Sequence, residues 1–326
     1  MALLFCLLLS QMLAAAAAAA AAISTPLEAL RAACLPEQPL RQVHAFANDT
    51  VVENIAVRAN GHLLVSLLFE GELRQVDPAA PNATTPELVH FFNGSTMING
   101  IAEISPDVFA VSTNPGALWT VDLNGAAPAV AQVASVPDAG LLNGVAALPA
   151  ADDAAAVLVA DSVRGAVWRV DTRAGTARIV HADERTMAAV FDPAANLSIG
   201  INGIRLGRDG FLYYSNTPKQ LLARVRVDPA SGEALAPYEI LAQGFVVDDF
   251  ALAADADAAA YVASGSVIRR VFFNGTVDVV AGSADSGVLA GASSAAFGRT
   301  AWDAGLLYVT TTGAGVSGGK IVAVHA

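Results

Sequence analysis

The sequence predicts an all-β protein, a six-bladed β-propeller of four-stranded blades. The first observation is an internal repeat: a short motif that starts with a polar residue recurs about every 45 residues, the length of one four-stranded blade. Copies begin at Glu53, Asn99, Asn143, Asn202 and Asp248, and a sixth is expected at Ala295. The second observation is that each repeat is rich in β-branched residues bounded by Gly, Asn and Asp. Radial repetition of such units leaves few free strand edges.

Each repeat contains four segments with the pattern of strands. The first strand starts at the polar motif, and the second is the most apolar. We expect the second strands at 62–68, 108–112, 156–160, 211–215, 259–263 and 306–310. The sixth repeat ends with 320–325 and lacks a fourth strand, which residues 41–46 can supply. Pairing of the N- and C-terminal strands would close the ring and remove its exposed edge.

The chain divides into three parts. Residues 3–23 carry no charged side chain and pass from a Leu-rich to an Ala-rich half, which is typical of a secretory signal peptide. We assign the signal peptide to residues 1–22; an uncleaved anchor is the alternative, because about 20 apolar residues can span a bilayer. Residues 23–39 form an N-terminal segment in which 26–33 can form a short helix. Residues 40–326 are the single propeller domain.

Five Asn-x-Ser/Thr sequons agree with passage through the secretory pathway. All are expected in loops, where a glycan can be accommodated. They lie at Asn48, Asn82, Asn93, Asn196 and Asn274. We therefore expect a secreted or lumenal glycoprotein that has no stable membrane span after signal cleavage.

The charge composition restricts the kinds of partner. The chain has 18 Lys and Arg against 30 Asp and Glu, a formal net charge of −12. Binding to a nucleic-acid backbone requires clustered basic residues, so we expect no nucleic-acid partner.

Oxygen-bearing side chains should converge on the central channel, which the first strand of every blade lines. Five of the six expected first positions, all except Ala295, carry such side chains. They could bind a substrate or a hard cation such as Ca²⁺. A structural role is the alternative, because the three Asn-Gly pairs also suit turns with positive φ. A second polar layer is expected where the second strands end, at Thr113, Asp161, Asn216, Ser264 and Thr311.

The loops expected at the same mouth of the channel are apolar. They contain Met97, Leu142, Phe191 and Phe245, with few Lys or Arg. The longest of these loops, 182–201, could act as a lid. A lipophilic small molecule is therefore the expected partner, and packing beneath the loops is the alternative role for these side chains.

The chain resembles the gluconolactonase/regucalcin-like superfamily of six-bladed propellers. The resemblance lies in Glu53, Asn143, Asn202-Gly203 and Asp248, together with the runs Val159-Ala-Asp-Ser162 and Leu212-Tyr-Tyr-Ser-Asn216. It implies a divalent cation, Ca²⁺ or another, held by Glu53, Asn202 and Asp248. It also implies that Asp248 acts as the base in lactone or phosphotriester hydrolysis, with Asn143 binding the substrate.

Other runs are similar to a group of fungal secreted propellers. These runs are Leu142-Asn-Gly-Val145, Ala160-Asp-Ser162, Asn202-Gly-Ile-Arg205 and Ala295-Ala-Phe-Gly-Arg-Thr300. The group includes the hetero-Diels-Alderases of tropolone–sesquiterpenoid pathways. Those enzymes join a tropolone-type o-quinone methide to a terpene alkene such as humulene. The resemblance implies an enzyme that performs a cycloaddition without a cofactor.

On this hypothesis, Asn143, Asn202 and Asp248 are the catalytic residues. The residues expected to bind substrate are Glu53, Asn99, Asp161, Asn216, Met97, Leu142, Phe191 and Phe245. A metal-dependent lactonase is the alternative function, and a non-catalytic binding propeller is a third.

Overall fold

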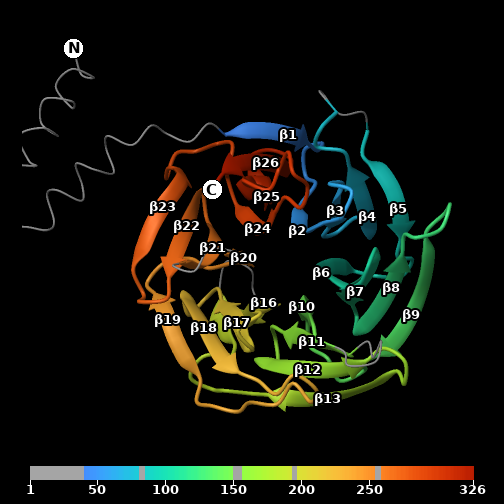
Figure 1. Cartoon of the computed structure of the whole chain (residues 1–326), viewed down its shortest axis with the longest axis vertical. Coiled ribbons are helices and arrows are strands. Elements are labelled where there is room, and N and C mark those ends of the chain that lie inside the picture. The colour runs from blue at the N-terminus through green and yellow to red at the C-terminus, as the bar shows by residue number, and fades with distance from the viewer. Residues whose placement is uncertain (1–39, 81–84, 150–155, 193–196, 254–257) are drawn as a thin grey trace, which may run out of the picture. The chain divides into compact units, whose positions relative to one another are not determined.

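The computed structural model describes residues 40–326 except 81–84, 150–155, 193–196 and 254–257. Six four-stranded antiparallel sheets stand around a central axis as the blades of a propeller (Figure 1). This confirms the predicted fold class. The predicted signal peptide at 1–22, the segment 23–39 and the sequons at Asn82 and Asn196 lie outside the described residues.

Blades one to three follow one another along the chain, each running from the channel outward. Blade one contains β2 (Val52–Val57), β3 (Leu63–Leu67), β4 (Glu72–Val76) and β5 (Glu87–Phe91). Blade two contains β6 (Met97–Ser105), β7 (Val108–Asn114), β8 (Ala117–Asp122) and β9 (Ala129–Ser135). Blade three contains β10 (Leu142–Ala147), β11 (Ala156–Asp161), β12 (Ala166–Asp171) and β13 (Thr176–His181).

A small hairpin, β14 (Val190–Asp192) paired with β15 (Leu197–Ile199), separates blade three from blade four. Blade four contains β16 (Ile201–Leu206), β17 (Phe211–Asn216), β18 (Leu221–Arg226) and β19 (Glu239–Gln243). Blade five contains β20 (Phe250–Leu252), β21 (Ala258–Ser264), β22 (Val267–Phe272) and β23 (Val277–Gly282). The hairpin lies within the long loop that the sequence predicts.

Blade six is built from both ends of the propeller. It contains β24 (Ala292–Phe297), β25 (Leu306–Thr311), β26 (Lys320–His325) and β1 (Arg41–Ala45), with the short helix η1 (Gly313–Gly315) before β26. The strand β1 pairs with β26 from Arg41 opposite Ala323 to Ala45 opposite Lys320. The predicted closure is confirmed, and the outer edge of β26 is covered by β1.

The second strand of each blade is the most buried because it has a strand on both sides and a neighbouring blade over each face. Every residue of β3 and of β11 is buried. Apolar clusters fill the spaces between blades, such as the cluster that joins Leu158 and Val167 of blade three to Leu212 and Tyr214 of blade four. No helix among the described residues is long and apolar enough to cross a membrane.

Serine side chains tie neighbouring blades together beside the channel. Ser66 Oγ accepts the N–H of Asn54 in its own blade at 3.0 Å and donates to the Asn99 carbonyl of blade two at 2.8 Å. Ser112 repeats this arrangement with the Gly100 N–H and the Asn143 carbonyl. These paired hydrogen bonds fix the height of each inner strand relative to the next, and so place the polar ring.

Candidate functional site

The polar ring is formed by equivalent residues at the start of the innermost strands. Strand pairing aligns Ile55, Ile101, Val145, Ile204, Phe250 and Ala295, because each lies opposite the corresponding residue of the second strand. The ring position lies two residues earlier, so its members are Glu53, Asn99, Asn143, Asn202, Asp248 and Ser293.

The expectation that Ala295 holds the sixth place is therefore wrong. Ala295 pairs with Val309 and is buried in the core between blades. The correct residue, Ser293, bonds to the Val52 carbonyl at 2.7 Å and to Thr310 Oγ1 at 3.0 Å. Ala295-Ala-Phe resembles the Asn-Gly-Ile motif only in hydrophobicity, and it lies two residues further along the strand. With Ser293 in the sixth place, all six ring positions carry a side-chain oxygen.

The glycines after the ring asparagines are explained by close packing. Gly100, Gly144 and Gly203 are not among the residues with positive φ, so the turn interpretation is wrong. A Cβ on Gly100 would lie 2.5 Å from the Asn143 carbonyl oxygen, and one on Gly144 would lie 2.7 Å from the Asn202 carbonyl oxygen. Glycine is therefore required because adjacent inner strands approach backbone to backbone.

The carboxyl side of the ring is formed by Glu53 and Asp248. Burial raises the pKa of Glu53 to about 7, and the nearby charge of Asp249 adds to this effect. Burial also raises the pKa of Asp248 well above its ordinary value, assisted by the charges of Glu53 and Asp249. The Asn202 amide donates to Asp248 Oδ1 at 2.6 Å and opposes that rise. These carboxyl groups consequently retain protons at a pH where solvated carboxyls have lost them.

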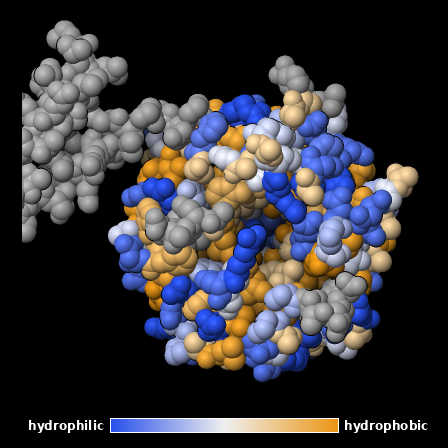
Figure 2. Space-filling view, in the orientation of Figure 1, coloured by the Kyte–Doolittle hydropathy of each residue, from blue (hydrophilic) through white to orange (hydrophobic). Residues whose placement is uncertain are grey.

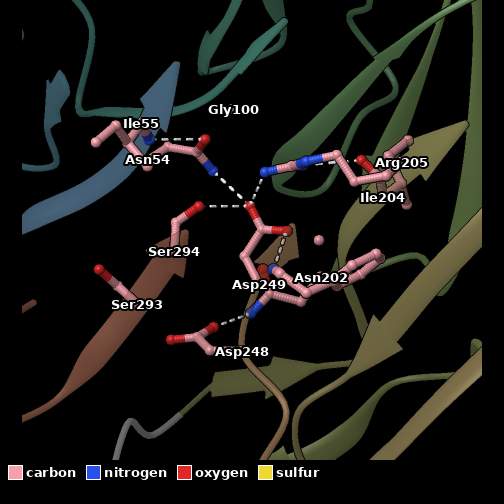
Figure 3. A network of polar contacts seen from close by, with 12 residues as sticks. Asn54, Ile55, Gly100, Asn202, Ile204, Arg205, Asp248, Asp249, Ser293 and Ser294 are labelled. Carbon is pink, nitrogen blue, oxygen red and sulfur yellow. Dashed lines mark hydrogen bonds and ion pairs between the residues drawn. The ribbon is translucent and has the colours of Figure 1, made fainter. Parts of the chain in front are cut away.

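Asp249 lies at the centre of a second layer of polar contacts (Figure 3). Its Oδ2 accepts hydrogen bonds from Asn54 Nδ2 at 2.9 Å and Ser294 Oγ at 3.0 Å. The same oxygen forms an ion pair with Arg205 Nη2 at 2.7 Å. One carboxylate therefore joins blades one, four and six to its own blade, one residue beyond the ring position.

Sequence reasoning missed this second layer. The signal lies in the aligned repeats. The position of Arg205 is occupied by alanine in each of the other five blades, at Ala56, Ala102, Ala146, Ala251 and Ala296. An arginine among alanines facing a channel needs an acidic partner. The consecutive pair Asp248-Asp249 is where that partner could have been found.

Two ring asparagines are held by the protein itself. Asn99 Oδ1 accepts from Asn114 Nδ2 at 3.2 Å, and Asn143 Nδ2 donates to Ser162 Oγ at 3.2 Å. Both side chains are buried. The structure thus places the expected residues around the channel, with Asn202 and Asp248 in direct contact and Asn99 and Asn143 anchored to their own blades.

The predicted substrate contacts of Asp161 and Asn216 need correction. Asp161 is fully buried and accepts from Gly140 N, Leu141 N and Trp168 Nε1 at 2.9–3.0 Å. Asn216 is also fully buried and donates to the carbonyls of Thr186 and Ala188. These strand-end side chains organise the loops above them because those loops expose backbone groups that must be satisfied.

The apolar residues expected at the channel mouth fall into two groups. Leu142 is fully buried in the core between blades two and three, so the packing alternative holds for it. Phe191 lies on β14 and is 59% exposed. Met97 and Phe245 are half-buried, and the Phe245 ring lies 5.1 Å from the Arg269 guanidinium.

The ring supplies some, but not all, of the oxygen ligands that a divalent cation needs. Glu53 and Asp248 are close enough to influence each other electrostatically, and carboxylates are the ligands that Ca²⁺ prefers. Asn202 directs its amide nitrogen, not its oxygen, toward Asp248. The described residues contain no cluster of three or more His, Cys, Asp or Glu arranged to hold a metal. A cation here would depend on asparagine amides and water for its remaining ligands.

No protein-family model matches the chain. It is 32% identical over 316 residues to a Sarocladium schorii protein named provisionally as a hetero-Diels-Alderase, covering 83% of this chain and 78% of that one. A Phoma sp protein with the same provisional name is 29% identical over 311 residues, covering 83% and 86%.

The fold has many solved counterparts. Regucalcin, a calcium-binding protein of Agrobacterium tumefaciens, matches with a TM-score of 0.63 at 16% identity, covering 88% of this chain and 93% of that one. A structure named provisionally as a gluconolactonase matches with a TM-score of 0.64 at 13% identity, covering 88% and 92%. These structural likenesses concern the fold.

Proposed function

Because this chain belongs to the hetero-Diels-Alderase family of gluconolactonase/regucalcin-like six-bladed propellers, we propose that it catalyses a hetero-Diels–Alder cyclisation. The substrates would be a tropolone-type o-quinone methide and a sesquiterpene alkene such as humulene. The observation that carries the proposal is the similarity to the Sarocladium schorii protein of that provisional name. The channel carboxyl groups Glu53 and Asp248, whose pKa values are raised, supply candidate hydrogen-bond donors.

The reaction needs activation of one carbonyl group. The heterodiene supplies C=C–C=O and the alkene supplies C=C; one C–C bond and one C–O bond form together, and no atom is lost. A hydrogen bond to the carbonyl oxygen withdraws electron density from the heterodiene and lowers the barrier. A protonated Asp248 or Glu53 is a stronger donor than water. Glu53 is held by strand β2 and Asp248 by its hydrogen bond from Asn202.

Neighbouring side chains would position the reactants. The Asn202 amide fixes the Asp248 carboxyl through the 2.6 Å hydrogen bond. Asn143 lies at the equivalent position one blade earlier and is expected to bind the tropolone oxygens. The exposed Phe191 and half-buried Met97 and Phe245 supply apolar contacts for the terpene. Holding both reactants in a near-attack pose contributes further to the rate.

Metal-dependent lactone hydrolysis is the second candidate, and the proximity of two carboxyl groups favours it. Glu53, Asp248 and Asn202 would hold the cation, which supplies a polarised carbonyl and an activated water. Asp248 would then act as the base. A non-catalytic binding propeller is the third candidate.

The decisive experiment measures adduct formation from the quinone-methide precursor and humulene with the full chain. We expect Asp248→Ala to lower the enzyme-dependent rate by roughly 100-fold, while Asp138→Ala, an exposed aspartate on a loop, leaves it unchanged. EDTA should leave the wild type active. Loss of activity in EDTA, restored by Ca²⁺, together with lactone hydrolysis would replace the cycloaddition proposal by the lactonase.

A further inference from the structure

We infer that the far end of the channel is a second binding site, for a neutral and largely apolar molecule with one carbonyl oxygen. A cavity of about 390 Å³ lies there, on the other side of Asp249 from the polar ring. The innermost strands of all six blades contribute to its wall. Figure 2 shows the propeller hollowed at its centre. The volume lies within the range of roughly 300–1,000 Å³ that small-molecule sites occupy.

The space exists because small side chains repeat around the channel. At one height of the ring, five blades place alanine: Ala56, Ala102, Ala146, Ala251 and Ala296. Ile55, Ile101 and Val145, which directly precede three of these alanines, also line the chamber. A closed interior would place larger side chains here, since protein cores are packed to crystal-like density. The repeated alanine therefore leaves a chamber in which Arg205 and Glu103 are the charged residues among otherwise apolar side chains.

Arg205 is the polar end of this chamber. It occupies the alanine position of blade four, and its side chain is 19% exposed. Its Nη2 is held by Asp249 at 2.7 Å and its Nη1 by the Ile204 carbonyl at 2.9 Å. A guanidinium has five N–H donors, so these two contacts leave donors that can bind a ligand oxygen. The ion pair holds the group in place before a ligand arrives, which lowers the entropic cost of binding.

The charge balance selects a neutral ligand. The Arg205 charge is matched by Asp249, which is 4% exposed. The other charged residue on the wall, Glu103, is matched by Arg299. A free carboxylate or phosphate would have to compete with Asp249 for Arg205, whereas a carbonyl oxygen needs only one spare N–H. An apolar ketone or quinone therefore suits the site better than an organic acid.

The chamber is distinct from the proposed reaction site. Asp249 accepts hydrogen bonds from Asn54 and Ser294 (Figure 3). Each of the three directly follows a ring residue, so along the inner strands they lie between the ring and the alanine positions that line the chamber. Glu53 and Asp248 lie on the other side of these three residues and are not among the residues that line the chamber. Binding in the chamber can consequently be measured without cycloaddition.

The test compares 2-acetylnaphthalene with 2-ethylnaphthalene, in which a CH2 group replaces the carbonyl group. Isothermal titration calorimetry on the full chain should show the ketone binding about tenfold more tightly, the value of one additional hydrogen bond. Ala102→Leu should weaken binding of both molecules at least tenfold by filling the chamber. Ala131→Leu, the same exchange on the exposed outer strand β9, should leave both affinities unchanged.

A second variant isolates the guanidinium. Arg205→Lys retains a cation for Asp249 but loses the planar fork, so the preference for the ketone should fall to about threefold or less while 2-ethylnaphthalene binds as before. Equal affinities of the wild type and Ala102→Leu, or no preference for the ketone, would overturn the inference. Loss of cycloaddition in Ala102→Leu would also overturn it, because the chamber would then be the reaction site.

Discussion

Replacing Glu53 by glutamine should remove a pH-dependent cost in stability. Burial raises the pKa of Glu53 from 4.5 to about 7, so the folded chain binds this proton more tightly than the unfolded chain does. The contribution of Glu53 to the free energy of unfolding is therefore largest below pH 4.5, and it decreases as the pH rises through 7. Glutamine has nearly the same shape as protonated glutamate and carries no charge at any pH.

The magnitude follows from the interval between the two pKa values. Each pH unit in this interval is worth about 1.4 kcal/mol, which gives an upper limit of about 3 kcal/mol. Since Glu53 is half-buried, water access reduces the value, and we expect roughly 1–3 kcal/mol. Removing the Glu53 charge also lowers the pKa of Asp248, because that charge contributes to the rise, and this acts in the same direction.

Urea denaturation of the wild type and Glu53→Gln at pH 5, 6, 7 and 8 measures the effect. The difference should be smallest at pH 5 and grow to its full value at pH 8, where the variant should be the more stable protein. The exposed Glu184 provides the control, and Glu184→Gln should follow the wild type at every pH. A constant difference between Glu53→Gln and wild type from pH 5 to 8 would show that Glu53 does not titrate as a buried group.

Four further outcomes are expected. Deleting residues 40–47 removes β1, which covers the edge of β26, and should lower the melting midpoint by roughly 10 °C or more; a truncated chain that melts like the full one would contradict ring closure. Adduct formation by the wild type should decrease as the pH rises above about 7, where Glu53 loses its proton, and an unchanged rate at pH 8 would contradict carboxyl activation. Asn202→Ala, measured at pH 6, should lower the rate roughly tenfold because Asp248 loses its fixed position; an unaltered rate would exclude that positioning role. Glycosidase treatment of protein from a eukaryotic host should increase electrophoretic mobility, since the sequon residues Asn48, Asn93 and Asn274 are exposed in turns, whereas no change would count against secretion.

The fold could be predicted because the repeat is visible in the sequence. Polar-Gly-apolar motifs mark the inner strands, and β-branched runs mark the buried second strands. The missing fourth strand of the last blade predicts the pairing of β1 with β26, since an open edge has to be covered. The motifs are local and can be recognised one by one, and comparing the repeats then reveals the missing strand.

The site was less predictable because it depends on register between blades. A shift of two residues preserves the alternation of a strand, so hydrophobicity alone could not distinguish Ser293 from Ala295 as the sixth ring residue. The burial of Asp161 and Asn216 depends on loops that cross over them, which spacing does not reveal. Arg205 becomes informative only after the blades are aligned, when it is seen to replace an alanine.

The charges in the channel define the choice between the candidate functions. Three acidic residues, Glu53, Asp248 and Asp249, lie near one another, and Arg205 pairs with Asp249. In the described part of the chain neither Glu53 nor Asp248 belongs to an ion pair. Two neighbouring carboxylates without a cation are costly in a buried site, so they must either retain a proton or recruit a cation. Retained protons provide hydrogen-bond donors for a cycloaddition, whereas a recruited cation provides activated water for hydrolysis. The protonation state of Glu53 and Asp248 is therefore the property on which the chemistry of this propeller depends.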